Sequence, residues 1–122
     1  MISSIGTDII KIARFSRMTP HFMARVFTAG ERAYLLEKST ATAAGLFAAK
    51  EAVAKALGTG FRGFWPNDIE IWHDGLGKPH VRLHGEALKA AKKTVKRRLK
   101  RIQILVSISH TDTDAMAFAV II

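Results

Sequence analysis

Glu51 and Lys55 stand four residues apart in a stretch that is rich in alanine and contains no proline. The composition of residues 42–57 predicts a helix, and residues with this spacing share one helical face. An exposed Glu–Lys pair of this kind usually contributes little stability. Small apolar residues surround the pair, however, so the helix is expected to be buried. A charged pair on a buried helix is costly, which favours a functional role for it.

Asp8 stands in an apolar segment, residues 2–10, whose β-branched composition predicts a strand. Aspartate is depleted in strands, so Asp8 is either a cap at a strand end or a ligand of a hard metal ion. With Glu51 it would supply two carboxylates, a set that suits Mg²⁺ when water and substrate phosphates complete the coordination. The two acids are distant in sequence, so their types alone do not place them together.

Ser107, Ser109 and His110 end a late apolar segment. A hydroxyl beside a histidine suggests a hydrolase, but no G-x-S-x-G motif is present. A histidine at a strand end among polar neighbours is suited to bind a phosphate or a base, or is an ordinary turn residue. The loop at residues 58–63 is glycine-rich, but it follows a helix and so does not match a phosphate-binding loop.

The composition limits the class of protein. A chain of 122 residues with 48% apolar residues predicts a single domain, residues 1–122, with a substantial core. The absence of cysteine excludes disulfides and thiol nucleophiles. Asp8 interrupts any signal-like apolar segment, so a cytoplasmic protein is expected. The net charge of +9 implies an anionic partner, and the basic stretch 89–101 is either a solvated face or a contact for an acidic protein or nucleic acid.

The expected elements indicate an α+β fold. Residues 11–25 predict two short helices divided at Pro20, and a T-x-x-E capping box at Thr28 predicts a helix to about Lys38. Residues 85–99 predict a basic amphipathic helix. The later predicted strands are residues 68–72, 80–83, 104–109 and 115–122. The order of strand, helices, hairpin, helix and hairpin indicates a largely antiparallel sheet.

Four sequence blocks, in a fixed order, give the chain a family resemblance. They are residues 5–10, 47–60 and 77–79, and residues 107–110 with Ala115 and Ala117. With these blocks the chain resembles the holo-acyl-carrier-protein synthases of the small, single-domain bacterial type, over nearly its whole length. The resemblance implies the 4′-phosphopantetheinyl transferase fold, with a long buried helix packed against the sheet. It also implies a homotrimer with active sites at the subunit interfaces.

The resemblance further implies an activity and a metal. The expected reaction moves 4′-phosphopantetheine from coenzyme A to a serine of apo-acyl-carrier protein, for fatty acid biosynthesis, and releases adenosine 3′,5′-bisphosphate. Asp8 and Glu51 are expected to bind Mg²⁺ together with the coenzyme A pyrophosphate. Lys55 would lie beside that pyrophosphate, which makes Asp8, Glu51 and Lys55 the expected catalytic residues.

Other residues are assigned to ligands by the same resemblance. Lys50 and His110 are expected near the nucleotide of coenzyme A, and Gly58 and Thr111 are expected to line its pocket. Two further residues match positions that face the acidic carrier protein. These are Arg14 and Arg25, in the early helices.

Some questions stay open at this point. The family often has arginine at the position of Leu46, so a phosphate contact is missing or is supplied elsewhere, for example by Arg62. Either Glu51 or a metal-bound water could take the proton of the carrier serine. The carrier could also belong to polyketide or peptide synthesis. A small basic nucleic-acid-binding module is the alternative from another class, but it leaves Asp8, Glu51 and the Gly-Lys-Pro block unexplained, so nucleic acid is not expected as a partner. The longest apolar run, residues 115–122, is too short to span a bilayer as a helix, so no membrane partner is expected.

Overall fold

The computed structural model describes residues 2, 4–58, 60–94 and 102–122. The strands are β1 (Ser4–Lys11), β2 (Ile69–His73), β3 (Pro79–Leu83), β4 (Ile104–His110) and β5 (Asp114–Ile121). The α-helices are α1 (Pro20–Val26), α2 (Ala29–Leu35), α3 (Thr40–Ala56) and α4 (Gly85–Thr94), and the 3₁₀ helices are η1 (Ile12–Phe15) and η2 (Pro66–Asp68).

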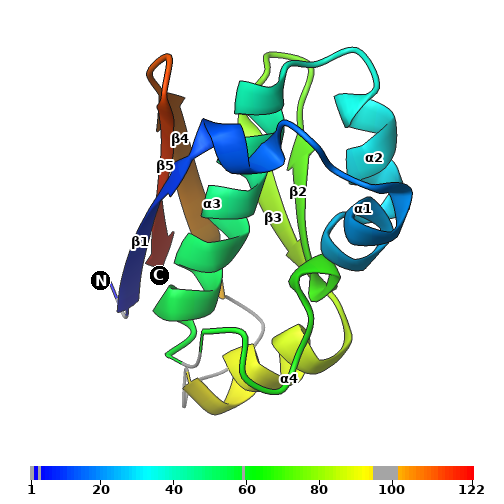
Figure 1. The fold of residues 1–122 in the computed structure, drawn as a ribbon. Coiled ribbons are helices and arrows are strands. Elements are labelled where there is room, and N and C mark those ends of the chain that lie inside the picture. Colours follow the sequence, from blue (N-terminus) through cyan, green and yellow to red (C-terminus); the bar gives the residue numbers. More distant parts are fainter. Residues whose placement is uncertain (1, 3, 59, 95–101) are drawn as a thin grey trace.

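The strands form two antiparallel sheets, one of three strands in the order β1-β5-β4 and one hairpin of β2 and β3. In the larger sheet, Asp8 pairs with Ala117 and Ala117 pairs with Ile108. Helix α3 lies between this sheet and the hairpin, while α1 and α2 pack on the hairpin side (Figure 1). The long helix therefore touches every layer of the molecule.

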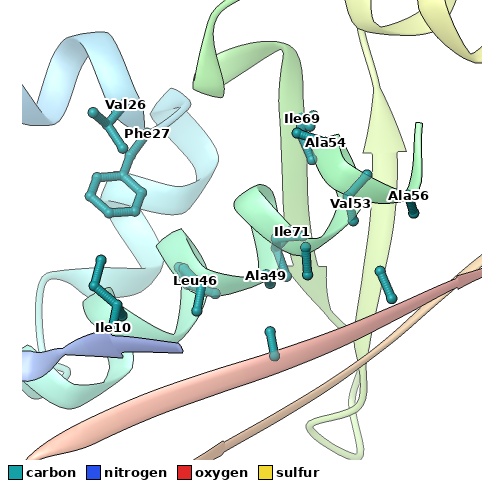
Figure 2. Packing of buried hydrophobic residues seen from close by; sticks show 14 of the residues in the cluster. Ile10, Val26, Phe27, Leu46, Ala49, Val53, Ala54, Ala56, Ile69 and Ile71 are labelled. Carbon is teal, nitrogen blue, oxygen red and sulfur yellow. The ribbon is translucent and has the colours of Figure 1, made fainter. Parts of the chain in front are cut away.

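The interior is built around α3. The Ser39 side chain accepts a hydrogen bond from the Thr42 backbone and caps its first turn. Gly58, with a φ of 88°, follows its last turn, a conformation that favours glycine. The small side chains along the helix let the surrounding elements approach closely. Leu46 and Val53 belong to one buried core with Ile69, Ile71 and other residues from neighbouring elements (Figure 2).

Most of the expected architecture is confirmed. The long buried helix, the capping box at Thr28 and the antiparallel pairing all form. The first of the two short helices predicted in residues 11–25 is not an α-helix. Residues 12–15 form a 3₁₀ helix instead, a conformation that is common in segments of only three or four residues. The basic helix is described only to Thr94, so its predicted continuation through residues 95–99 lies outside the described residues. Within the described residues, no helix has the length and hydropathy needed to span a membrane.

Gly6 allows the backbone of β1 to lie directly on α3. A methyl group at this position would lie 2.0 Å from the Ala52 carbonyl oxygen and 2.7 Å from the Ala56 nitrogen. We therefore expect Gly6→Ala to lower the free energy of unfolding by about 1–3 kcal/mol, measured by urea denaturation. Gly75→Ala is the matched control, because a methyl group there meets nothing within 4 Å. Equal stability of the two variants would contradict the close contact.

Candidate active site

Asp8 lies in the middle of β1 with its side chain on the helix-facing side of the sheet. Its neighbours on that side, Gly6 and Ile10, are both buried. The Asp8 side chain is 17% exposed, so it remains partly accessible from outside the protein. Because Gly6 brings the strand against α3, Asp8 stands beside the part of the helix that carries Glu51 and Lys55.

Lys55 links the last turn of α3 to β1. Its Nζ donates to Asp8 Oδ1 at 3.1 Å and to the Thr7 carbonyl oxygen at 3.0 Å. The side chain remains 51% exposed, so the pair contributes little to stability. The pair instead holds the Lys55 ammonium group beside the Asp8 carboxylate. The ammonium group stays accessible to a negatively charged ligand.

Glu51 stands one helical turn before Lys55 and is half-buried. Burial raises the pKa of its carboxyl group, and the negative charge of Asp8 raises that pKa further. The positive charges of Lys55 and Arg14 act in the opposite direction. The two predicted acids are thus close enough to repel each other, and Arg14 lies within reach of the same field.

This pair of carboxylates fits a magnesium ion. Their mutual repulsion would be relieved by a cation bound between them. Among the described residues, no group of three or more His, Cys, Asp or Glu side chains could enclose a metal. Two carboxylates with open positions match the way Mg²⁺ is held by one or two protein acids and substrate phosphates. Asp8 and Glu51 therefore supply a suitable donor set.

His110 belongs to a separate hollow on the other side of α3. This cavity has a volume of about 380 Å³ and lies between the first turns of α3, the hairpin turn and β4. Its polar lining includes Thr42, His73, Lys78, Ser107 and His110. The Thr111 carbonyl oxygen accepts a hydrogen bond from His110 Nδ1 at 3.0 Å, which leaves Nε2 for a ligand.

The carboxylate pair and this cavity occupy different faces of one chain. Asp8 is on β1 and the cavity is on β4, with β5 between these strands. On α3, the cavity residue Gly45 and Glu51 are about 120° apart around the helix axis. The structure therefore brings Asp8, Glu51 and Lys55 together but does not bring them together with His110.

The remaining predicted ligand residues have local structural roles as well. The Thr111 hydroxyl accepts hydrogen bonds from the backbone of Thr113 at 3.2 Å and Asp114 at 3.1 Å, and so shapes the β4–β5 turn. Gly58 terminates α3, and its backbone N–H donates to the Lys55 carbonyl oxygen at 2.9 Å. Both residues are next to functional candidates, since Thr111 follows His110 and Gly58 closes the helix that carries Lys55.

The predicted position of Lys50 near the nucleotide of coenzyme A does not fit its contacts in the structure. Its ammonium group donates to Glu31 Oε1 at 2.6 Å, to the Pro66 carbonyl oxygen at 3.2 Å and to the Ile69 carbonyl oxygen. The side chains of Lys50 and Glu31 are both fully buried. All three ammonium hydrogens are used inside the protein, so Lys50 cannot serve as the predicted nucleotide contact in this structure. Burial lowers the pKa of Lys50, and the Glu31 carboxylate opposes that shift.

The cavity also contains residues that the sequence did not single out. His73 ends β2, stacks on Tyr34 with ring centroids 4.3 Å apart, and lines the same wall as Lys78. Leu46, at the family's arginine position, lines this cavity too, whereas Arg62 is exposed and belongs to none of the described pockets. The Gly-Lys-Pro block was the available signal for Lys78, but no sequence pattern marked His73.

Comparisons with known proteins agree with this fold. The sequence model of the 4′-phosphopantetheinyl transferase superfamily matches residues 4–114, which defines the class of protein. A curated relative, the holo-[acyl-carrier-protein] synthase of Clostridium botulinum strain Eklund 17B, is 48% identical and the match covers 99% of this chain and 98% of the relative. The chain therefore belongs to this superfamily, in its holo-[acyl-carrier-protein] synthase family.

Solved structures of similar proteins share the whole architecture. The holo-[acyl-carrier-protein] synthase of Neisseria meningitidis has a TM-score of 0.82 and 35% identity, and the match covers 100% of this chain and 99% of that one. The Helicobacter pylori synthase in complex with coenzyme A has a TM-score of 0.80 and 30% identity, and the match covers 97% of this chain and 99% of that one. One of these similar proteins is thus described with coenzyme A bound.

Proposed function

We propose that this chain transfers 4′-phosphopantetheine from coenzyme A to a serine of apo-acyl-carrier protein, with Mg²⁺ held by Asp8 and Glu51. The observation that carries the proposal is the approach of Asp8 and Lys55 across β1 and α3, with Glu51 one turn away on the same helix. The bound coenzyme A of a relative with the same fold supports coenzyme A as the donor.

The proposed reaction exchanges one phosphorus–oxygen bond for another. The serine Oγ of the carrier forms a bond to the β-phosphorus, and the bond from that phosphorus to the bridging oxygen breaks. Adenosine 3′,5′-bisphosphate leaves with the bridging oxygen, and the serine proton is released. In such transfers, positioning and charge neutralisation supply most of the catalysis.

The chain's own residues suit these roles. When bound, Mg²⁺ would supply charge neutralisation to the pyrophosphate oxygens. Lys55, half-exposed beside Asp8, would turn its ammonium group to the leaving phosphate. Glu51, or a water molecule bound to the metal, would accept the serine proton.

We place the nucleotide of coenzyme A in the cavity lined by His110. Since this cavity and the acid pair occupy different faces of one chain, a complete site would form where the cavity of one copy meets the acids of another. The outer face of the larger sheet supports such an assembly, because it exposes a contiguous set of apolar side chains. They are Ile5, Ile9, Leu105, Met116 and Phe118. We take the assembly to be a homotrimer.

A mixing experiment tests the shared site. Glu51→Gln and His110→Ala should each give a nearly inactive protein. After subunit exchange, the two together should recover roughly a quarter of wild-type activity, because some interfaces then contain both intact halves. Mixing His110→Ala with Lys78→Ala is the control, since both changes affect the same half. No recovery in the first mixture would place the whole site in one chain.

Carrier docking is proposed for the early helices. No Asp or Glu occurs between residues 9 and 30, while Arg14 and Arg25 are exposed there. An acidic carrier would be attracted to this surface and oriented by it. Arg14 also contributes to the field at Glu51, so the docking surface continues into the reacting centre. We assign the reaction to fatty acid biosynthesis in the cytoplasm, as the acyl carrier protein in the relatives' names suggests.

A further inference from the structure

The turn between β2 and β3 forms one edge of the cavity in which we place the nucleotide of coenzyme A. Gly77, Lys78 and Pro79 line the cavity from this turn. Lys78 is exposed and brings a positive charge to the cavity wall, where a phosphate group of the nucleotide can meet it. The turn also contains two glycines, Gly75 and Gly77, which give the free backbone many conformations. The contacts that hold the turn therefore decide where this charge lies.

Asp74 holds the turn with both its backbone and its side chain. Its N–H donates to the Lys78 carbonyl oxygen at 3.0 Å, and its carbonyl oxygen accepts from the Gly77 N–H at 3.0 Å. Its carboxylate oxygen Oδ1 accepts from the backbone N–H groups of Leu76 at 2.9 Å and Lys78 at 3.0 Å. These hydrogen bonds connect the first residue of the turn to its last.

The second carboxylate oxygen of Asp74 anchors the turn to the strands of the hairpin. Oδ2 accepts a hydrogen bond at 2.8 Å from Nε2 of His80, and the His80 ring stacks on Trp72 with ring centroids 4.3 Å apart. The hydrogen bonds from His80 and from the backbone of Lys78 and Leu76 lower the pKa of Asp74 to about 2. The carboxylate is therefore charged at neutral pH, which makes it a strong acceptor for all three donors.

Asp74 does not itself line the cavity. Its carboxylate is occupied by donors of the hairpin, and a negative charge placed against a phosphate group would repel it. An effect of Asp74 on a bound nucleotide must then pass through the turn. Lys78 is the residue of this turn whose charge suits a phosphate group.

We propose that Asp74 is a positioning residue for coenzyme A, whose carboxylate fixes the backbone from which Lys78 reaches a phosphate group of the nucleotide. Because the turn is ordered before the donor arrives, binding does not have to supply the entropy of ordering it. The inference rests on the proposed function, because it takes coenzyme A as the ligand of the cavity.

Transfer kinetics test this role. Asp74→Ala should raise the KM for coenzyme A about tenfold, while kcat and the KM for apo-carrier protein stay close to wild type. Asp74→Asn should recover most of the loss, because its amide oxygen can still accept from the backbone of Leu76 and Lys78. Leu76→Ala is the matched control, since this side chain belongs to the same turn and is 98% exposed. An unchanged KM for coenzyme A in Asp74→Ala would overturn the proposal.

A double-mutant cycle tests whether Asp74 acts through Lys78. Lys78→Ala should by itself raise the KM for coenzyme A. Adding Asp74→Ala to this variant should raise that KM little further, because the charge that the turn positions has already been removed. If Asp74→Ala had its full effect in the Lys78→Ala background, Asp74 would act by another route and the proposal would be wrong.

Calorimetric titration separates this inference from the proposed function, because it needs neither a carrier nor transfer. With Mg²⁺ present, coenzyme A should bind Asp74→Ala about tenfold more weakly than wild type, and Leu76→Ala should bind it as wild type does. If coenzyme A bound with this dependence on Asp74 but no transfer occurred, only the proposed function would fall. Equal affinity of an active wild type and Asp74→Ala would overturn this inference alone. A wild type that did not bind coenzyme A would overturn both.

Discussion

Glu51→Gln should lower the rate of phosphopantetheine transfer by about 10²–10³-fold. Glutamine has nearly the size of glutamate and keeps the half-buried position, but it has no charge to hold Mg²⁺ and cannot accept the serine proton. The rate should be measured with saturating coenzyme A, carrier and Mg²⁺. Glu37→Gln is the control, because Glu37 is an exposed carboxylate at the end of the α2 region and should be dispensable.

The same substitution should leave the fold intact. Burial and the charge of Asp8 raise the pKa of Glu51 in the folded protein. A carboxyl group with a raised folded pKa favours folding where it is protonated, at low pH, and this contribution is lost as pH rises through its unfolded and then its folded pKa. At neutral pH, Glu51→Gln should therefore melt no lower than wild type. An inactive but unfolded variant would say nothing for the metal site, whereas a folded and fully active one would contradict it.

Lys50→Met should lower the free energy of unfolding by about 3–5 kcal/mol, the usual result of breaking a buried ion pair on one side. Methionine can fill most of the space, but Glu31 then keeps a fully buried charge without its cation. The carbonyl groups of Pro66 and Ile69 also lose their donor. The measurement is denaturant unfolding at neutral pH.

A second variant isolates the electrostatic part of this loss. The Glu31 carboxylate also accepts hydrogen bonds from the backbone of Thr28 and Ile71, both at 2.8 Å. Glutamine at position 31 can retain part of this role without a charge. Lys50→Met combined with Glu31→Gln should therefore be more stable than Lys50→Met alone. A single variant as stable as wild type would show that the pair is unimportant.

Local signals in the sequence were sufficient for most elements. The alanine-rich stretch predicted α3 because helix propensity and burial favour the same conformation there. Thr28 and Glu31 predicted a capping box, which forms with both of its hydrogen bonds. The motif did not indicate the second role of Glu31, which is to accept a hydrogen bond from Lys50, 19 positions later in the chain. No local sequence pattern marks such a contact.

The candidate site was only partly accessible from sequence. The spacing of Glu51 and Lys55 placed them on one helical face, but the approach of Asp8 depends on the contact at Gly6, which is a tertiary feature. The Lys50 side chain points in a different direction from that of Glu51, because adjacent residues of a helix are rotated by about 100° around its axis. That rotation carries Lys50 into the core, away from any ligand. The separation of His110 from the acids likewise depends on strand order, which local patterns do not specify.

The most direct test of the account is to incubate the protein with coenzyme A and apo-acyl-carrier protein, with and without Mg²⁺, and to weigh the carrier. Apo-carriers from polyketide and peptide synthesis should be included for comparison. We expect the acyl carrier protein to gain the mass of one phosphopantetheine group when Mg²⁺ is present, and to gain none when Mg²⁺ is removed or Glu51 is replaced by glutamine. A carrier of unchanged mass, or equal modification without Mg²⁺ and with Glu51→Gln, would contradict the proposed site.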